Sequence, residues 1–161
     1  MMWRSKSLAC LAPCLALALV ALAACGEEDN FLEGSLGSQY DLSFESVRAR
    51  EFLTSRQLHV EYVRDQGAGE EKPITVTLQP TPTGPASFTH VDGNVAIDNS
   101  LGAGSPGLPD LTSATVELVK FTPGTADSAI VGTIHANFTH SGSGDSFSLE
   151  GRFSTSLTLV P

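Results

Sequence analysis

The sequence predicts an all-β domain, an antiparallel β-sandwich, that follows a cleaved N-terminal signal peptide. After residue 40, apolar and polar residues alternate with period two, as in strands with one buried face. Clusters of Gly, Pro, Asn and Asp divide this region into about seven to nine short segments. So many short strands in one domain are typical of a sandwich or of a closed β-barrel, which is the alternative fold.

Residues 1–24 have the three parts of a secretory leader. Arg4 and Lys6 give a positive start, an apolar run of Leu, Ala and Val follows, and the small residues Ala23 and Ala24 end it. The apolar run is interrupted by a proline and is shorter than the roughly 20 residues of a membrane-spanning helix. We therefore expect a signal peptide that is cleaved.

The segment Leu22-Ala23-Ala24-Cys25 resembles the lipobox of bacterial lipoproteins. In that family the cysteine thiol receives diacylglycerol, cleavage frees the amine, and a further acyl chain such as palmitate is added. Two or more acyl chains hold a protein stably in a bilayer. The resemblance implies that Cys25 is the lipid attachment site. An Asp directly after the lipidated cysteine would favour retention in the inner membrane. This position is Gly26, which favours the outer membrane.

Residues 26–38 are rich in Gly, Ser and acidic side chains. This composition predicts a flexible tether after the lipidated Cys25, spanning on the order of 20 Å. The folded domain is expected to cover residues 39–161 and to float just off the membrane.

The positions of the cysteines and the net charge of the mature chain argue against several functions. All three cysteines, Cys10, Cys14 and Cys25, lie in the leader or at the lipid anchor, so the domain has neither a disulfide nor a thiol nucleophile. Cleavage leaves 7 of the 9 basic residues against 18 acidic ones, a net charge of −11. Such a charge disfavours nucleic acid and anionic lipid surfaces as partners.

The predicted strands follow the alternation in chain order. Asp92-Gly93-Asn94 is a turn signal that predicts a hairpin between the two short segments flanking it. Residues 99–112 form a long loop with glycines and prolines, and loops of this length are usually functional or disordered. The expected strands lie at residues 42–51, 57–64, 74–78, 88–91, 95–98, 115–121, 130–139 and 146–160.

The last two strands form a hairpin with a definite register. If Thr139 pairs with Ser146, apolar residues of both strands share one face, and a shift by one residue would turn them outward. The core-face pairs are Phe138–Phe147, Ala136–Leu149, Ile134–Gly151 and Gly132–Phe153. The predicted core contains Phe44, Val60, Tyr62, Val76, Phe121, Ile134, Phe138, Phe147, Leu149, Phe153 and Leu157.

No motif for catalysis, a cofactor or a metal stands out. The sequence contains neither a Gly-x-Ser-x-Gly elbow nor a His-Glu-x-x-His zinc motif. The four histidines, His59, His90, His135 and His140, do not form a local ligand pair. In the register above, His135 lies opposite Glu150. This register therefore predicts an ion pair between the two side chains on the surface. We therefore predict no catalytic, cofactor-binding or metal-binding residue.

Four arginines, Arg48, Arg50, Arg56 and Arg64, concentrate positive charge in the first half of an acidic domain. They favour protection of a sheet edge against further pairing. A strip that recognises anions is the alternative.

The whole chain resembles uncharacterised small bacterial lipoproteins of the kind common in myxobacteria. The resemblance rests on the lipobox at Cys25, the segment from Tyr40 to Arg50 (YDLSFESVRAR), the segment LHVEYV from Leu58, and the closing GRFSTSL from Gly151. It implies a location in the cell envelope and a β-fold, and it carries over no catalytic residue.

These observations predict an envelope protein that acts as a non-catalytic binding or structural module. It would present a loop or sheet edge, with residues 99–112 as the candidate surface, to another envelope protein. Two alternatives remain open. The domain could be an envelope hydrolase, or it could carry a small apolar ligand if it is a hollow barrel.

Overall fold

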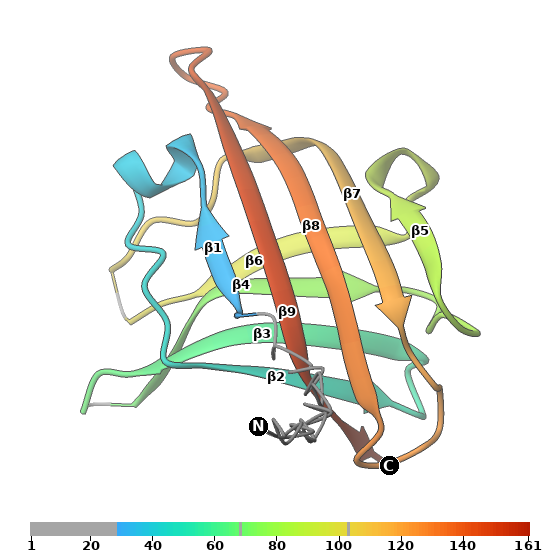
Figure 1. Cartoon of the computed structure of the whole chain (residues 1–161). Coiled ribbons are helices and arrows are strands. Elements are labelled where there is room, and N and C mark those ends of the chain that lie inside the picture. Colours follow the sequence, from blue (N-terminus) through green and yellow to red (C-terminus); the bar gives the residue numbers. More distant parts are fainter. Residues whose placement is uncertain (1–28, 68, 103) are drawn as a thin grey trace, which may run out of the picture.

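The computed structural model describes residues 29–67, 69–102 and 104–161 (Figure 1). This part of the chain contains nine strands and two short 3-10 turns, which confirms the predicted all-β class. No helix in it is long and apolar enough to cross a membrane. The strands are β1 (Phe31–Glu33), β2 (Ser46–Phe52), β3 (Gln57–Asp65), β4 (Glu70–Leu78), β5 (Ala86–Thr89), β6 (Val95–Ser100), β7 (Asp110–Lys120), β8 (Ala129–Thr139) and β9 (Ser146–Val160), and the turns are η1 (Ser35–Ser38) and η2 (His90–Asp92).

The strands form one sheet in the order β5-β7-β8-β9-β2-β3-β4-β6, and β1 adds to β9. In Figure 1, β9, β8, β7 and β5 make a front layer whose strands cross those of the back layer, β2, β3, β4 and β6. The sheet is nearly closed and barrel-like, because the two ends of this order come together where β6 approaches η2 and β7. The architecture therefore lies between the predicted sandwich and its barrel alternative.

One strand pair differs from the predicted antiparallel sheet. β2 and β9 are parallel, with Ala49 opposite Leu157 and Phe52 opposite Val160, so the sheet is mixed. Parallel neighbours need a long connection, and almost the whole domain lies between these two strands. Their pairing joins the beginning of the domain to its end.

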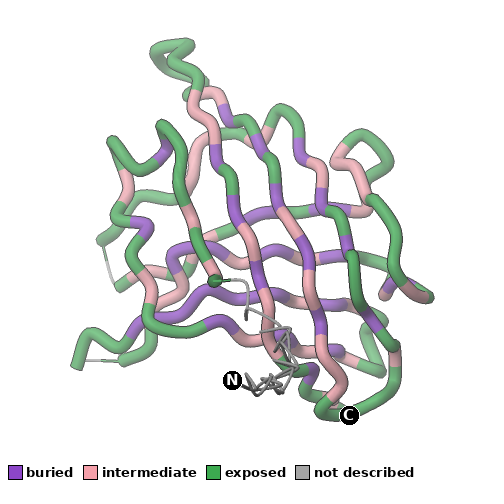
Figure 2. The backbone as a smooth tube through the Cα atoms, viewed as in Figure 1, coloured by how far each residue is buried: buried purple, intermediate pink, exposed green. Residues whose placement is uncertain are grey.

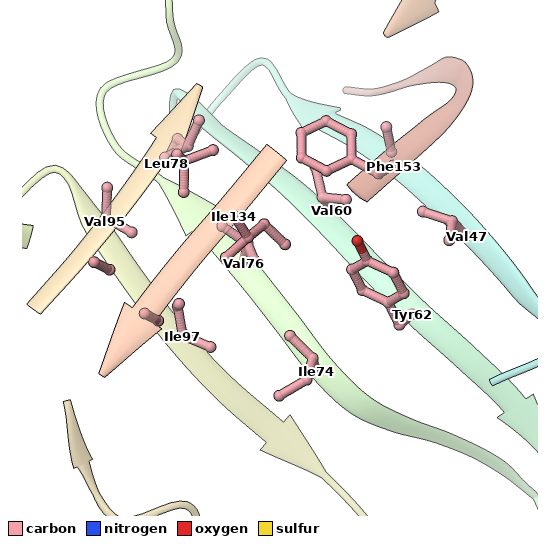
Figure 3. Close-up of a cluster of buried hydrophobic side chains, with 14 of the residues drawn as sticks. Val47, Val60, Tyr62, Ile74, Val76, Leu78, Val95, Ile97, Ile134 and Phe153 are labelled. Atoms are coloured by element: carbon pink, nitrogen blue, oxygen red, sulfur yellow. The ribbon is translucent and has the colours of Figure 1, made fainter. Parts of the chain in front are cut away.

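The core lies between the two layers and is filled by side chains. Alternate residues of most strands are buried, which Figure 2 shows as a repeating pattern along the tube. Figure 3 shows valine, isoleucine and leucine side chains gathered with Tyr62 and Phe153. The predicted core is confirmed: nine of its residues are buried, and Phe44 and Phe147 pack against it half-buried.

The predicted register of the last hairpin is also confirmed. Thr139 lies opposite Ser146, and all four predicted core-face pairs are present. A Cβ added at Gly132 would lie 2.5 Å from the ring of Phe153, so only glycine leaves room for that ring. The large and small residues of this hairpin are therefore complementary in shape.

The expected tether is wrong over residues 31–38. β1 pairs with β9, and Leu36 in η1 is fully buried. Asn30 also accepts a hydrogen bond from the Ser154 amide. The polar composition of this segment concealed a few apolar side chains that pack on the domain. The predicted signal peptide, with Leu22, Ala23, Ala24 and the lipid attachment site Cys25, lies outside the described residues.

The predicted hairpin around Gly93 is wrong as well. β5 and β6 do not pair with each other: β5 pairs with β7, and β6 pairs with β4. The chain turns through η2 and Gly93, whose φ is 71°, and passes from one layer to the other. These two short strands therefore become the two ends of the sheet.

Candidate functional site

The nearly closed sheet has an open seam between β6 and the beginning of β7. β6 pairs with β4 on one side only. The pairing of β5 with β7 covers residues 115–118, so residues 110–114 of β7 have β8 as their single strand partner. Within the part of the chain that the structure describes, two strand edges without a partner strand thus face each other across this seam.

A hollow of about 520 Å³ lies at the seam. β6 forms one wall, the first residues of β7 and the preceding loop form the other, and His90 lies at one end. The lining residues are His90, Ala96, Ile97, Asp98, Asn99, Gly107, Leu108, Pro109, Asp110 and Leu111. The predicted partner surface, residues 99–112, supplies more than half of them.

The described parts of the loop after β6, residues 101–102 and 104–109, are held at three points. The Gly102 amide donates to Glu71 at 2.9 Å. The carbonyl of Pro106 accepts from the Asn99 side chain at 3.3 Å, and that of Gly107 accepts from the Tyr40 hydroxyl at 2.9 Å. A loop fixed in this way loses less conformational entropy when it binds a partner.

Glu71 also connects this loop to the end of the barrel. Its carboxylate receives hydrogen bonds from the Gly102 amide and from Arg64, which in turn contacts Asp41 at 2.6 Å. The Gly102 amide and the Arg64 guanidinium hold the pKa of Glu71 below its usual range. At neutral pH the loop is therefore tied to a charged carboxylate.

A second hollow, of about 450 Å³, lies on the other side of the same loop. It is formed where the loop meets the segment after η1 and the turn between β8 and β9. Its lining residues are Gln39, Tyr40, Pro106, Pro109, His140, Ser143, Asp145 and Phe147. The loop is therefore a ridge between two hollows.

The surface around this ridge is acidic. Asp98 and Asp110 are exposed beside the first hollow, and Asp145 is exposed beside the second. Neither set of lining residues includes a lysine or an arginine. This surface therefore favours a cationic partner over an anionic one.

The second hollow brings together a serine, a histidine and an aspartate, but not as a catalytic triad. A triad needs the histidine to bridge the serine and the acid. Here the Ser143 hydroxyl donates directly to Asp145, and the His140 ring accepts from the Gly142 amide at 3.2 Å. All of them lie in an exposed turn. This arrangement does not activate the serine.

The remaining histidines lie apart. His135 and Glu150 approach to 3.9 Å with both side chains more than half exposed, as the register predicted. His59 packs against the Phe52 ring, with the ring centroids 4.6 Å apart. Among the residues that the structure describes, no group of three or more His, Cys, Asp or Glu side chains could hold a metal ion.

Arg48, Arg50 and Arg64 do not protect a sheet edge, because β2 and β3 are interior strands, and Arg56 lies in the turn between these strands. Instead, Arg48 and Arg50 on β2 and Lys72 on β4 all bind Glu61 on β3. The Glu61 side chain is only 1% exposed although it lies on the outer face of the back layer. We call Glu61, Arg48, Arg50 and Lys72 the Glu61 cluster.

Ionisation of Glu61 is controlled by this cluster. Burial opposes the charged form, but hydrogen bonds from Arg50 and Lys72 outweigh it and lower the pKa of the Glu61 carboxyl. Glu61 was not among the residues predicted from the sequence. The available signal was a lone acid among apolar residues, Leu58-His-Val-Glu-Tyr-Val63, across from a strand with two arginines.

We predict that Glu61→Gln lowers the free energy of unfolding by about 3 kcal/mol at pH 7, because it leaves three cations without their shared carboxylate. The Glu61 pKa is lower in the folded protein than the roughly 4.3 of the unfolded chain, so the carboxylate stabilises the fold above that pH. The difference between wild type and variant should therefore shrink as the pH falls below about 4.3.

Urea unfolding between pH 3 and pH 7 measures this difference. Glu150→Gln is the matched control, since Glu150 is exposed beside His135, and its effect should stay below about 0.5 kcal/mol. Equal effects of the two substitutions at pH 7 would contradict the stabilising role of the Glu61 cluster.

Comparison of the chain with protein-family models, with curated proteins and with solved structures found no match.

Proposed function

We propose that the protein is a lipoprotein of the cell envelope, attached to the outer membrane through Cys25, and that its β-domain is a non-catalytic binding module. The observation that carries the binding role is the loop after β6, which is held at Gly102, Pro106 and Gly107 and lies between two acidic hollows. The partner would be another envelope protein.

The segment that would connect the domain to the membrane is shorter than the tether predicted from the sequence. Asn30 is already hydrogen-bonded to Ser154 on β9, so only residues 26–29 separate the domain from Cys25. A fully extended chain spans at most about 18 Å over the five residue steps from Cys25 to Asn30. A lipid on Cys25 would therefore hold this side of the domain close to the bilayer.

The candidate binding surface extends away from that point of attachment. Phe147, in the second hollow, lies on the same strand as Ser154 and about 23 Å from it at the rise of an extended strand. A partner can then reach this hollow without displacing the domain from the membrane.

The other two functions receive less support. A carrier of small apolar ligands needs a hollow interior, and the space between the layers is filled by buried side chains (Figure 3). A hydrolase needs an activated nucleophile, and the arrangement of Ser143, Asp145 and His140 does not provide one.

Cys25→Ser tests the lipid anchor. The variant lacks the thiol that receives diacylglycerol, so we expect loss of metabolic labelling with palmitate and loss of the protein from the membrane fraction. Cys14→Ser, within the predicted leader, is the matched control and should behave as wild type. Membrane association of Cys25→Ser at the wild-type level would exclude the proposed anchor.

Site-specific photocrosslinking in cells tests the binding surface. A photoreactive residue at Ser105, exposed on the loop, should give a discrete adduct with another envelope protein. The control is Ser156, which is exposed on β9. Absence of an adduct at Ser105, or the same adduct at both positions, would contradict binding through this surface.

A further inference from the structure

We infer that the partner binds as an extended, basic peptide segment that adds as a strand to the free edge of β6. This inference rests on the proposed binding function and names the chemistry of the partner. It follows from the direction of the β6 main chain, the absence of lysine and proline from β6, and the charge around the seam.

The ladder with β4 shows which β6 groups are already paired. The Gln79 amide donates to the Asn94 carbonyl at 3.0 Å, so the main chain of Asn94 points toward β4. Main-chain groups alternate in direction along an antiparallel strand. Ala96 and Asp98, opposite Thr77 and Thr75, therefore direct their amides and carbonyls toward β4 as well.

The intervening residues direct their main chains toward the seam. The Val95 carbonyl confirms this direction, because it accepts from the His90 ring at 3.1 Å. Ile97 and Asn99 follow with the same orientation, and both line the hollow. Their amides and carbonyls are placed as donors and acceptors for an added strand.

β6 lacks the lysine and proline that often protect a sheet edge against strand addition, and its one charged residue is Asp98. Lysine, proline and a very short strand protect the edges of natural sheets. β5, the opposite end of the sheet, has four residues and directly follows Pro85. β6 has six residues, none of which is lysine or proline. Residues 107–111 lie across the hollow from β6 and do not cover the edge of β6.

Charge favours a basic segment over a second copy of this chain. Asp98 is exposed on β6, and Asp110 lies across the hollow. An added strand would place alternate side chains beside Asp98 and the others beside the buried Ile97. Two copies joined through β6 would bring acidic residues together, which opposes self-pairing.

The test uses the full-length lipoprotein in detergent and fluorescein-labelled heptapeptides of alternating lysine and valine. Fluorescence polarisation should show binding at least about tenfold tighter than that of the glutamate–valine counterpart. In an antiparallel arrangement, the residue opposite Ile97 shares its face and exchanges main-chain hydrogen bonds with it, so the valine amides would bond β6. N-methylation of the valine amides should therefore abolish binding, and N-methylation of the lysine amides should preserve it.

Two matched variants locate the binding edge. Ala96→Lys adds a cation to β6 and should weaken binding at least about fivefold. Ala86→Lys, an equally exposed alanine on the β5 edge, should change it less than about twofold. Failure of the lysine–valine peptide to bind, or equal binding after valine N-methylation, would overturn strand addition. A concentration-dependent dimer that Ala96→Lys abolishes would also overturn it, in favour of self-pairing.

The same variants separate this inference from the proposed function. If the lysine–valine peptide fails but Ser105 still crosslinks to a partner in Ala96→Lys, the binding module stands and strand addition is wrong. If peptide binding and the Ser105 crosslink both fail in the wild type, both proposals are wrong.

Discussion

The position of β9 in both layers is the constraint on which the rest of the structure depends. One edge of β9 pairs with β8 along most of its length, and the other pairs first with β1 and then with β2. The Tyr62 hydroxyl, from the back layer, donates to the Arg152 carbonyl on β9 at 2.8 Å, and burial raises the pKa of that hydroxyl. A Cβ at Gly151 would lie 2.9 Å from Leu32 and 3.2 Å from this hydroxyl, so glycine permits β1 and Tyr62 to approach β9 together.

This use of β9 determines where the sheet stays open. The layers are joined through β9 and β2, so the opposite ends of the strand order, β5 and β6, must meet on the far side. There the chain crosses between layers through η2, and β6 and β7 stay apart far enough to leave the hollow. The Glu61 cluster lies on interior strands, where three cations share one buried carboxylate and stabilise the sheet. The acidic residues around the seam have no lysine or arginine among the lining residues, so that surface is acidic.

The sequence was most informative where one local pattern determines the structure. The alternation from Ser146 to Val160 and its match to the preceding strand predicted the register of the last hairpin, because a shift by one residue would expose Phe153 and Leu157. The parallel pairing of β2 with β9 could not be predicted, since it joins distant segments and leaves no local signal. The turn at Gly93 was recognised, but the partners of its flanking strands depend on long-range contacts.

The candidate site was predicted only in part. Glycines and prolines identified the loop in the sequence. Its position beside two hollows depends on hydrogen bonds from Tyr40 and Asn99, which only the folded chain brings to the loop. Residues 31–38 looked like a tether because Gly, Ser and acids outnumber the few apolar side chains that dock on β9.

Amide hydrogen exchange of the free protein, followed by NMR, tests the open seam most directly. If the edge of β6 is unpaired, the Ile97 and Asn99 amides should exchange at least about tenfold faster than those of Ala96 and Asp98, which bond to β4. Equal protection of all four amides would show that another segment already pairs with β6, and would contradict both the open seam and the strand addition inferred from it.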